Sequence, residues 1–145
     1  MAGWDTVYGR LLTLLPAVTG IADVYDGPPA SESWPRQFIV VGDNGAGDAG
    51  SYTPDFSDIG YLTEETGEVL CLFGAQSGNT NLTALRAAVD GWVAAVRAEL
   101  VADKRLGVLE EGGYVNLSRV EPSQRQTPQG AVVSAVVTFS YLTRF

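Results

Sequence analysis

The 145-residue sequence predicts an α+β fold, with a mostly antiparallel sheet of four to five strands and two helices packed on one face. Segments with periodic apolar residues follow the order helix, strands, helix, strands, which is typical of this class. The length suits one domain, and 46% hydrophobic residues is an ordinary globular fraction. We therefore expect residues 1–145 to form a single domain in which the second helix covers the sheet.

Two segments have the 3.6-residue period of amphipathic helices. The first runs from Trp4 to Leu15 and is expected to stop at Pro16, which has no N–H to donate. The second is long and rich in alanine, and its apolar positions recur at Leu85, Val89, Trp92, Val96 and Leu100. Thr80 or Asn81 is expected to cap its start, and Lys104-Arg105 suit the negative end of its dipole.

Three segments before the second helix are expected to be extended. Ile21–Tyr25 is a short apolar strand closed by the turn sequence Asp26-Gly27-Pro28-Pro29. Gln37–Val41 is rich in β-branched residues without alternation, which indicates a strand covered on both faces or lying at a subunit contact. Tyr61–Phe73 is expected to be a strand or a hairpin, with Thr66-Gly67 as a possible turn inside it.

Two strands are expected after the second helix. Tyr114–Val120 predicts a strand with Val115, Leu117 and Arg119 on one face. Glu121–Gly130 is rich in Gln, Ser and Pro, so we expect a polar connection there. The longest strand is predicted over Ala131–Arg144, where five apolar side chains face one side, namely Val133, Ala135, Val137, Phe139 and Tyr141.

Between the strands, Gly42–Asp58 is rich in glycine and aspartate and has no period, so we expect a long acidic loop or the tip of an extended hairpin. Residues 45–50 match G-x-G-x-x-G, but no helical period follows, and the nearby aspartates would repel a phosphate. Asp43, Asn44 and Asp48 offer oxygens for calcium, but the remaining EF-hand ligands are missing. We predict no cofactor and no metal site.

No catalytic constellation is found in the sequence, so we expect the protein not to be an enzyme. Histidine is absent, which excludes imidazole bases and ligands. Cys71 is the only cysteine and is expected to be a small buried hydrophobe. Gly74–Gly78 resembles a nucleophile turn but has no base, and is expected to be a loop of small residues leading to the helix. A solvated acidic face is expected at Glu64, Glu65, Glu68, Glu110 and Glu111.

The charge balance also limits the partners. Nine Lys and Arg residues stand against 17 Asp and Glu residues, for a net charge of −8. Such a chain gains no counterion release on a polyphosphate, so we expect no tight binding of nucleic acid. The N-terminus lacks the basic region of a signal peptide, and no apolar run reaches the roughly 18 residues that span a bilayer. We expect a cytoplasmic protein without a membrane partner.

One ordered set of segments resembles a known family. An amphipathic helix precedes Val24-Tyr25-Asp26-Gly27-Pro28-Pro29 and the strand at Gln37–Gly42. Glu68–Leu72, the Ala-rich helix with Trp92, and Gly130–Val133 leading to Phe139–Arg144 follow later. Over roughly Trp4 to Arg144, this order resembles the tail terminator proteins of siphophages, especially those of actinobacterial phages.

The resemblance implies a virion protein at the neck of the tail, assembled in the host cytoplasm. Tail terminators are small α/β subunits that form a hexameric ring, cap the tail tube, end its growth and join the tail to the head. The implied partners are copies of the chain, the tail tube protein and the head–tail connector protein, with DNA passing through the lumen. The candidate assembly contacts are Asp43, Asp48, Tyr52, Asp55, Phe56, Arg119, Arg125 and Gln126.

Two alternatives remain open at the level of the sequence. The first is another neck or tail completion protein of the same virus class, such as a head–tail connector or a tail tube subunit. The second is a small-molecule or cofactor-binding enzyme that uses the Gly-rich loop at residues 42–58.

Overall fold

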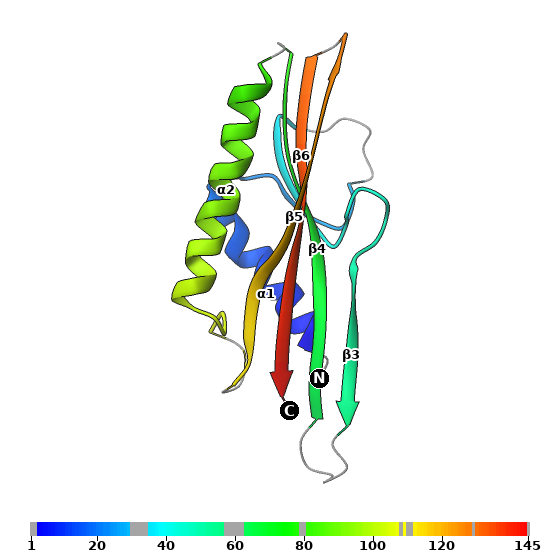
Figure 1. Ribbon diagram of the computed structural model, residues 1–145, viewed down its shortest axis with the longest axis vertical. Helices are drawn as coiled ribbons and strands as arrows, with labels where there is room; N and C mark the ends of the chain where they lie inside the picture. Colours follow the sequence, from blue (N-terminus) through cyan, green and yellow to red (C-terminus); the bar gives the residue numbers. More distant parts are fainter. Residues whose placement is uncertain are drawn as a thin grey trace.

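Two helices cover one face of a six-stranded sheet in the computed structural model, which describes residues 3–29, 35–56, 63–78, 81–107, 109, 112–128 and 130–144 (Figure 1). The strand order is β1-β2-β4-β6-β5, and β3 pairs with β4 beside that path. β1 and β2 are parallel, and the other described pairs are antiparallel. The predicted α+β class is confirmed, with one strand more than the upper expectation.

Helix α1 (Gly3–Thr19) runs one turn beyond its predicted end at Leu15 and includes Pro16, which was expected to stop it. A proline loses one helical hydrogen bond, but Leu14 and Leu15 are buried and bind this turn to the core. The helix ends where Gly20 takes a φ of 75° and donates its N–H to the Pro16 carbonyl over 3.0 Å. Packing of the last turn therefore outweighs the missing bond.

Helix α2 (Leu82–Ala102) confirms the predicted periodicity. Asn81 is the N-cap, and its side-chain oxygen accepts a hydrogen bond from the Ala84 amide at 3.2 Å. Val89, Val96 and Leu100 are buried, whereas the larger Trp92 packs half-buried at the rim of the core. Lys104 and Arg105 follow the helix end, where the dipole is negative.

Strands β1 (Val24–Asp26) and β2 (Gln37–Val41) form one border of the sheet. β1 begins three residues later than predicted, since Ile21 instead packs in the core. β2 has the predicted bounds, and all four residues after Gln37 are buried, so the prediction of a strand covered on both faces is confirmed.

Strand β3 (Gly50–Phe56) lies inside the segment predicted as a long loop, so the loop prediction is wrong for these residues and the extended hairpin is closer. β3 pairs with the first half of β4 (Thr63–Ser77). Thr66-Gly67 is no turn, since both residues pair with β3 and β6. Gly67 is needed for space instead, because a Cβ there would lie 2.7 Å from the Tyr141 hydroxyl.

The small residues at Gly74–Ser77 also belong to β4 and do not form the predicted loop. A Cβ on Gly74 would overlap the Phe38 ring of β2, so glycine here allows an aromatic side chain to cross the strand. The serine considered for a nucleophile turn is thus a strand residue.

Strands β5 (Tyr114–Thr127) and β6 (Gly130–Arg144) form a long hairpin, so most of the predicted polar connection Glu121–Gly130 is strand. β5 carries a bulge between Leu117 and Arg119. The bulge puts Leu117 opposite Phe139 on the helix-covered face but Arg119 opposite Thr138 on the other, which corrects the prediction that they share a face. The second half of β5 has polar side chains on both faces, so the alternation of apolar and polar residues that predicts a strand is missing there.

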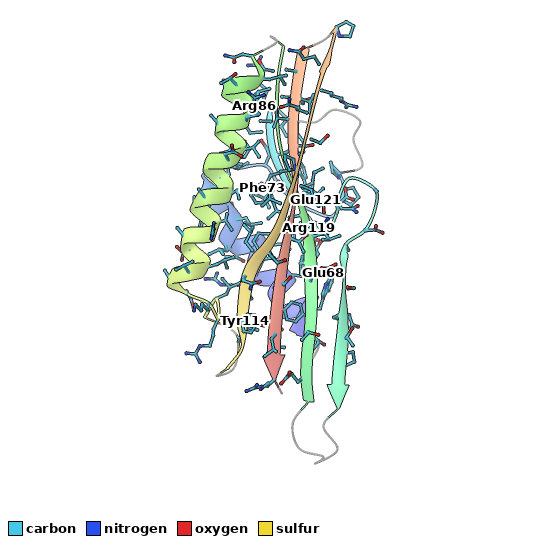
Figure 2. All side chains as sticks on the ribbon, in the orientation of Figure 1. Glu68, Phe73, Arg86, Tyr114, Arg119 and Glu121 are labelled. Carbon is cyan, nitrogen blue, oxygen red and sulfur yellow. The ribbon has the colours of Figure 1, made fainter. Side chains whose placement is uncertain are left out.

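The core lies between the helices and the sheet, where Phe73 points toward α2 (Figure 2). The five predicted apolar residues of β6 are all buried, as is Cys71 of β4. At opposite ends of the molecule, the tip of the β5–β6 hairpin and the free end of β3 extend beyond α2 (Figure 1). Neither helix is long and apolar enough to cross a membrane.

Candidate functional site

The predicted assembly contacts fall into two groups on opposite edges of the sheet. Asp43, Asp48 and Tyr52 lie in β3 or the loop before it, and the β3 backbone includes Asp55 and Phe56, whose side chains lie outside the described part of the chain. Arg119, Arg125 and Gln126 lie in β5. β4 and β6 separate the two edges, and three strand spacings amount to about 14 Å. The structure therefore brings each group together but keeps the two groups apart.

The loop before β3 is held by its own acidic and amide side chains. Asp43 is 5% exposed, and its Oδ1 accepts hydrogen bonds from the amides of Gly45 (3.1 Å) and Gly47 (2.9 Å). Asn44 Oδ1 accepts from the amides of Ala46 (2.8 Å) and Asp48 (3.1 Å). These side-chain oxygens order the loop. Asp43 therefore stabilises the loop of its own chain, and its role as an assembly contact stays a prediction.

The same loop does not have the surroundings of a nucleotide or metal site. Gly45 and Gly47 have φ values of 88° and 92°, and a strand rather than a helix follows them. A dinucleotide fingerprint needs a helix N-terminus at that point to hold the pyrophosphate. In the described residues, no group of three or more His, Cys, Asp or Glu side chains is placed to hold a metal ion.

An aromatic cluster connects the β3 edge to α1. The Trp4 ring centroid lies 5.0 Å from that of Tyr8 and 6.4 Å from that of Tyr52. Trp4 Nε1 donates to the Glu68 carbonyl at 2.9 Å, which fixes the indole against β4. Tyr52 remains 50% exposed. The helix thus positions a half-exposed aromatic side chain at the edge of the sheet.

Glu65 is a buried carboxylate that the sequence prediction assigned to a solvated face. It is 3% exposed, and its Oε2 accepts hydrogen bonds from the Tyr141 hydroxyl (2.7 Å) and the Trp4 amide (2.9 Å). The positive end of the α1 dipole also favours a carboxylate there. The two-residue period of β4, which puts Glu65 on the face of Val69 and Phe73, was the available signal.

The β5 edge carries exposed charges of both signs. Arg119 Nε lies 2.8 Å from Glu121 Oε1, and both side chains are more than half exposed (Figure 2). Arg86 on the neighbouring helix donates to Gln124 Oε1 at 3.1 Å, which joins α2 to β5. Arg125 and Gln126 are exposed farther along the strand.

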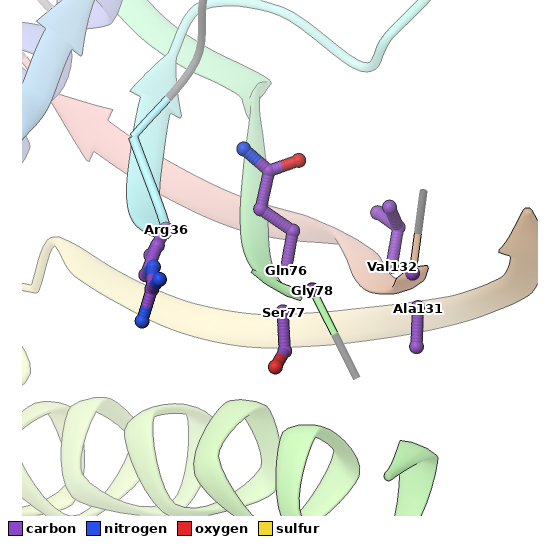
Figure 3. A pocket seen from close by; sticks show the side chains of 7 residues that line it. Arg36, Gln76, Ser77, Gly78, Ala131 and Val132 are labelled. Atoms are coloured by element: carbon purple, nitrogen blue, oxygen red, sulfur yellow. The ribbon is translucent and has the colours of Figure 1, made fainter. Parts of the chain in front are cut away.

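Several surface cavities open on the described part of the chain. One of about 500 Å³ is lined by residues 20–23, 36–37 and 75–76 and by Leu85 and Ala88 of α2. Another, of about 460 Å³, lies between α2 and β5 and is lined by Arg97, Leu100, Val101, Lys104 and residues 114–117. A cavity of about 290 Å³ lies farther along the same pair of elements. A further one, of about 240 Å³, lies at the end of β4 beside Arg36, Gln76 and Ser77 (Figure 3). Their linings combine apolar groups with cations and amides, which suits contact with a protein surface.

Three buried or partly buried groups hold their protons more strongly than usual. Burial raises the pKa of the Cys71 thiol from 9.0 to about 12. Burial, followed by the hydrogen bond to Asp26, raises the pKa of Tyr8 well above 10.0. Burial, followed by the hydrogen bond to Glu65, raises the pKa of Tyr141 in the same way. Each group is therefore neutral in the folded protein at neutral pH, and Cys71 is an unreactive thiol.

These shifts predict that the fold is sensitive to alkali. A raised pKa in the folded state means that its stabilisation is complete below the ordinary values of 9.0 and 10.0 and is lost as the pH rises through the folded values. We expect the urea midpoint to fall steadily between pH 9 and pH 11. Tyr141→Phe should flatten this fall, whereas Val101→Ala, at an exposed residue without an ionisable group, should not. A wild-type midpoint that stays constant to pH 11 would contradict the assignment.

Comparison with known proteins rests on the fold. The chain matches no protein-family model and no curated protein. Among solved structures, it is similar to a chain in the virion of the native gene transfer agent particle, with a TM-score of 0.57 and 15% sequence identity. The match covers 99% of this chain and 96% of the other. The whole α+β arrangement described above is therefore a fold also present in a protein of that virion.

Proposed function

We propose that this chain is a structural virion protein of the tail terminator type, in which residues 1–145 form one ring-building domain. The main support for this proposal is the similarity in fold to a chain of the gene transfer agent virion, which spans nearly all of both proteins. The order of segments in the sequence independently resembles tail terminators. On this proposal, copies of the chain form a ring, a hexamer in the resembling family, that caps the tail tube and joins it to the head connector.

The surfaces of the molecule support a subunit role. The sheet presents two different edges, and a ring needs two different patches on each subunit. On the face away from the helices, Leu70, Leu72 and Val136 are only half-buried, which leaves apolar surface for a neighbour. A net charge of −8 suits a ring through which DNA passes without adhering.

The two alternatives receive unequal support. A head–tail connector or a tail tube subunit would agree with the same fold comparison, so this alternative is separated from the proposal by its assembly. An enzyme using the Gly-rich loop gains no support from the loop, since Asp43 and Asn44 already bind its amides and a strand follows it.

The test of the proposed function combines solution mass and virion assembly. We expect negative-stain images of the full chain mixed with isolated tail tubes to show short rings bound at the tube ends. Light scattering of the chain gives its mass in solution and so the number of copies that associate. A tube subunit would instead give long tubes, and a connector would bind heads. Particles made without this gene should have tails of irregular length that fail to join heads. Regular, full-length, joined tails without the gene would overturn the proposal.

A further inference from the structure

Charge is distributed unequally between the two edges of the sheet. We define the α2–β5 edge as residues 82–107 and 114–127, which hold six basic and four acidic residues, and Glu110 and Glu111 lie in the sequence between these two ranges. The six are Arg86, Arg97, Lys104, Arg105, Arg119 and Arg125, and all are exposed. We define the β1–β3 edge as residues 20–29 and 37–56, which hold five acidic residues and no basic one. Six of the nine basic residues of the chain therefore lie on one edge, whereas every charged residue of the other edge is acidic.

The exposed apolar side chains follow the same division. Among the described residues, the large hydrophobic side chains that remain exposed are Tyr52 on the β1–β3 edge and Val101, Tyr114 and Val120 on the α2–β5 edge. Val101 and Tyr114, 67% and 41% exposed, line the cavity of about 460 Å³ together with Arg97 and Lys104. Each edge thus combines charge with apolar surface that the single chain leaves in water.

Several cations of the α2–β5 edge form no ion pair with a described residue. Across the described part of the chain, the ion pairs are Arg119–Glu121 and Arg144–Glu64, so Arg97, Lys104 and Arg125 have no carboxylate partner. In the sheet, β4 and β6 lie between the acidic edge and β5.

We infer that copies of this chain dock head to tail, with the acidic β1–β3 edge of one copy against the α2–β5 edge of the next. Tyr52 of the first copy enters the groove beside Tyr114 and Val101, and acidic side chains such as Asp48 face Arg97 and Lys104. This inference rests on the ring proposed above and names its contact. Two unlike patches on each subunit give a heterologous contact, which closes into a ring when the rotation between copies permits.

The contact is made by side chains rather than by extending the sheet. Pro54 lies in β3 and Pro122 in β5, and a proline has no N–H to give to an added strand. Both edge strands are thus interrupted in a way that opposes pairing with a neighbouring strand. Charge and the exposed aromatic side chain remain as the means of recognition, and charge pairs select partner and orientation.

Disulfide trapping tests the contact directly. We expect the Tyr52→Cys/Tyr114→Cys double variant, oxidised at high concentration, to give a series of linked multimers on a non-reducing gel. Each single variant should stay a monomer, and a mixture of the two singles should stop at dimers. Cys71 is fully buried and should not interfere. A double variant that stays monomeric, or single variants that dimerise equally well, would overturn the inference.

Charge exchange provides the second measurement. Arg97→Glu/Lys104→Glu and Asp23→Lys/Asp48→Lys should each associate at least roughly tenfold more weakly than wild type, because like charges then face each other. An equimolar mixture should recover association, since each variant supplies the edge that the other needs. Asp5→Lys, which changes the charge of an exposed α1 residue outside both defined edges, is the control. Unchanged melting temperatures verify folding, and no recovery in the mixture would refute the pairing.

The two proposals fail in different ways. Rings that form on tail tubes without a Tyr52–Tyr114 link would remove this contact and leave the ring proposal standing. Normal tails in the absence of the gene would remove the ring proposal, whatever the trapping experiment shows.

Discussion

Phe73→Ala is expected to lower the free energy of unfolding by about 3–5 kcal/mol. Phe73 is fully buried in β4, where it lies between the sheet and the helices (Figure 2). Removing the ring loses its transfer free energy and leaves a cavity that the neighbouring strands β2 and β6 cannot close, since both are fixed by backbone pairing. A domain is stable by only about 5–15 kcal/mol, so much of the variant should be unfolded under mild denaturant.

Urea unfolding followed by tryptophan fluorescence measures this loss. Val101→Ala is the control, because Val101 is 67% exposed and should change the free energy of unfolding by less than about 0.5 kcal/mol. A Phe73→Ala midpoint close to that of Val101→Ala would show that the core does not lie where the structure has it.

Glu65→Leu should be the most damaging change among the acidic residues. It removes the acceptor of both the Tyr141 hydroxyl and the Trp4 amide while the pocket stays closed to water. Each buried donor left without a partner costs about 1–3 kcal/mol, so a total of about 2–6 kcal/mol is expected for the two donors. The start of α1 should loosen from β4, because its first turn loses the carboxylate that holds it.

Matched variants separate the hydrogen bonds from the charge. Glu65→Gln keeps an acceptor oxygen and should lose less than Glu65→Leu, and Tyr141→Phe removes only one of the two bonds. Glu64→Leu is the control on the neighbouring, exposed acid, which forms a surface ion pair with Arg144 at 3.1 Å. Equal effects of Glu64→Leu and Glu65→Leu on the urea midpoint would contradict the buried role of Glu65.

Errors of the sequence prediction occur where strands were judged from composition. β3 and the second half of β5 are polar and rich in Gly, Pro or Gln, because both lie at edges of the sheet and have little apolar surface to bury. Neither strand has the alternation on which a periodicity test depends. The prediction for Glu65 failed for the opposite reason. Its position in β4 faces the core, but its charge indicated an exposed side chain.

The candidate assembly residues show the same division. Their identities as acidic, aromatic and basic groups could be taken from the sequence, and the structure places the acidic and basic groups on different edges. The face of Arg119 could not be predicted, because one extra residue at the bulge reverses every later side chain of β5.

By itself, the sequence determined what local periodicity encodes. That includes α2 with a cap at Thr80 or Asn81, β2, the buried face of β6, and a chain without histidine and with a strong acidic excess. Only the tertiary structure decided which segments meet: β3 with β4, Glu65 with the start of α1, and α2 with β5 as one basic edge. The physical reason is that strand pairing and burial depend on partners distant in sequence, whereas a helix or a buried strand face is specified by its own neighbours.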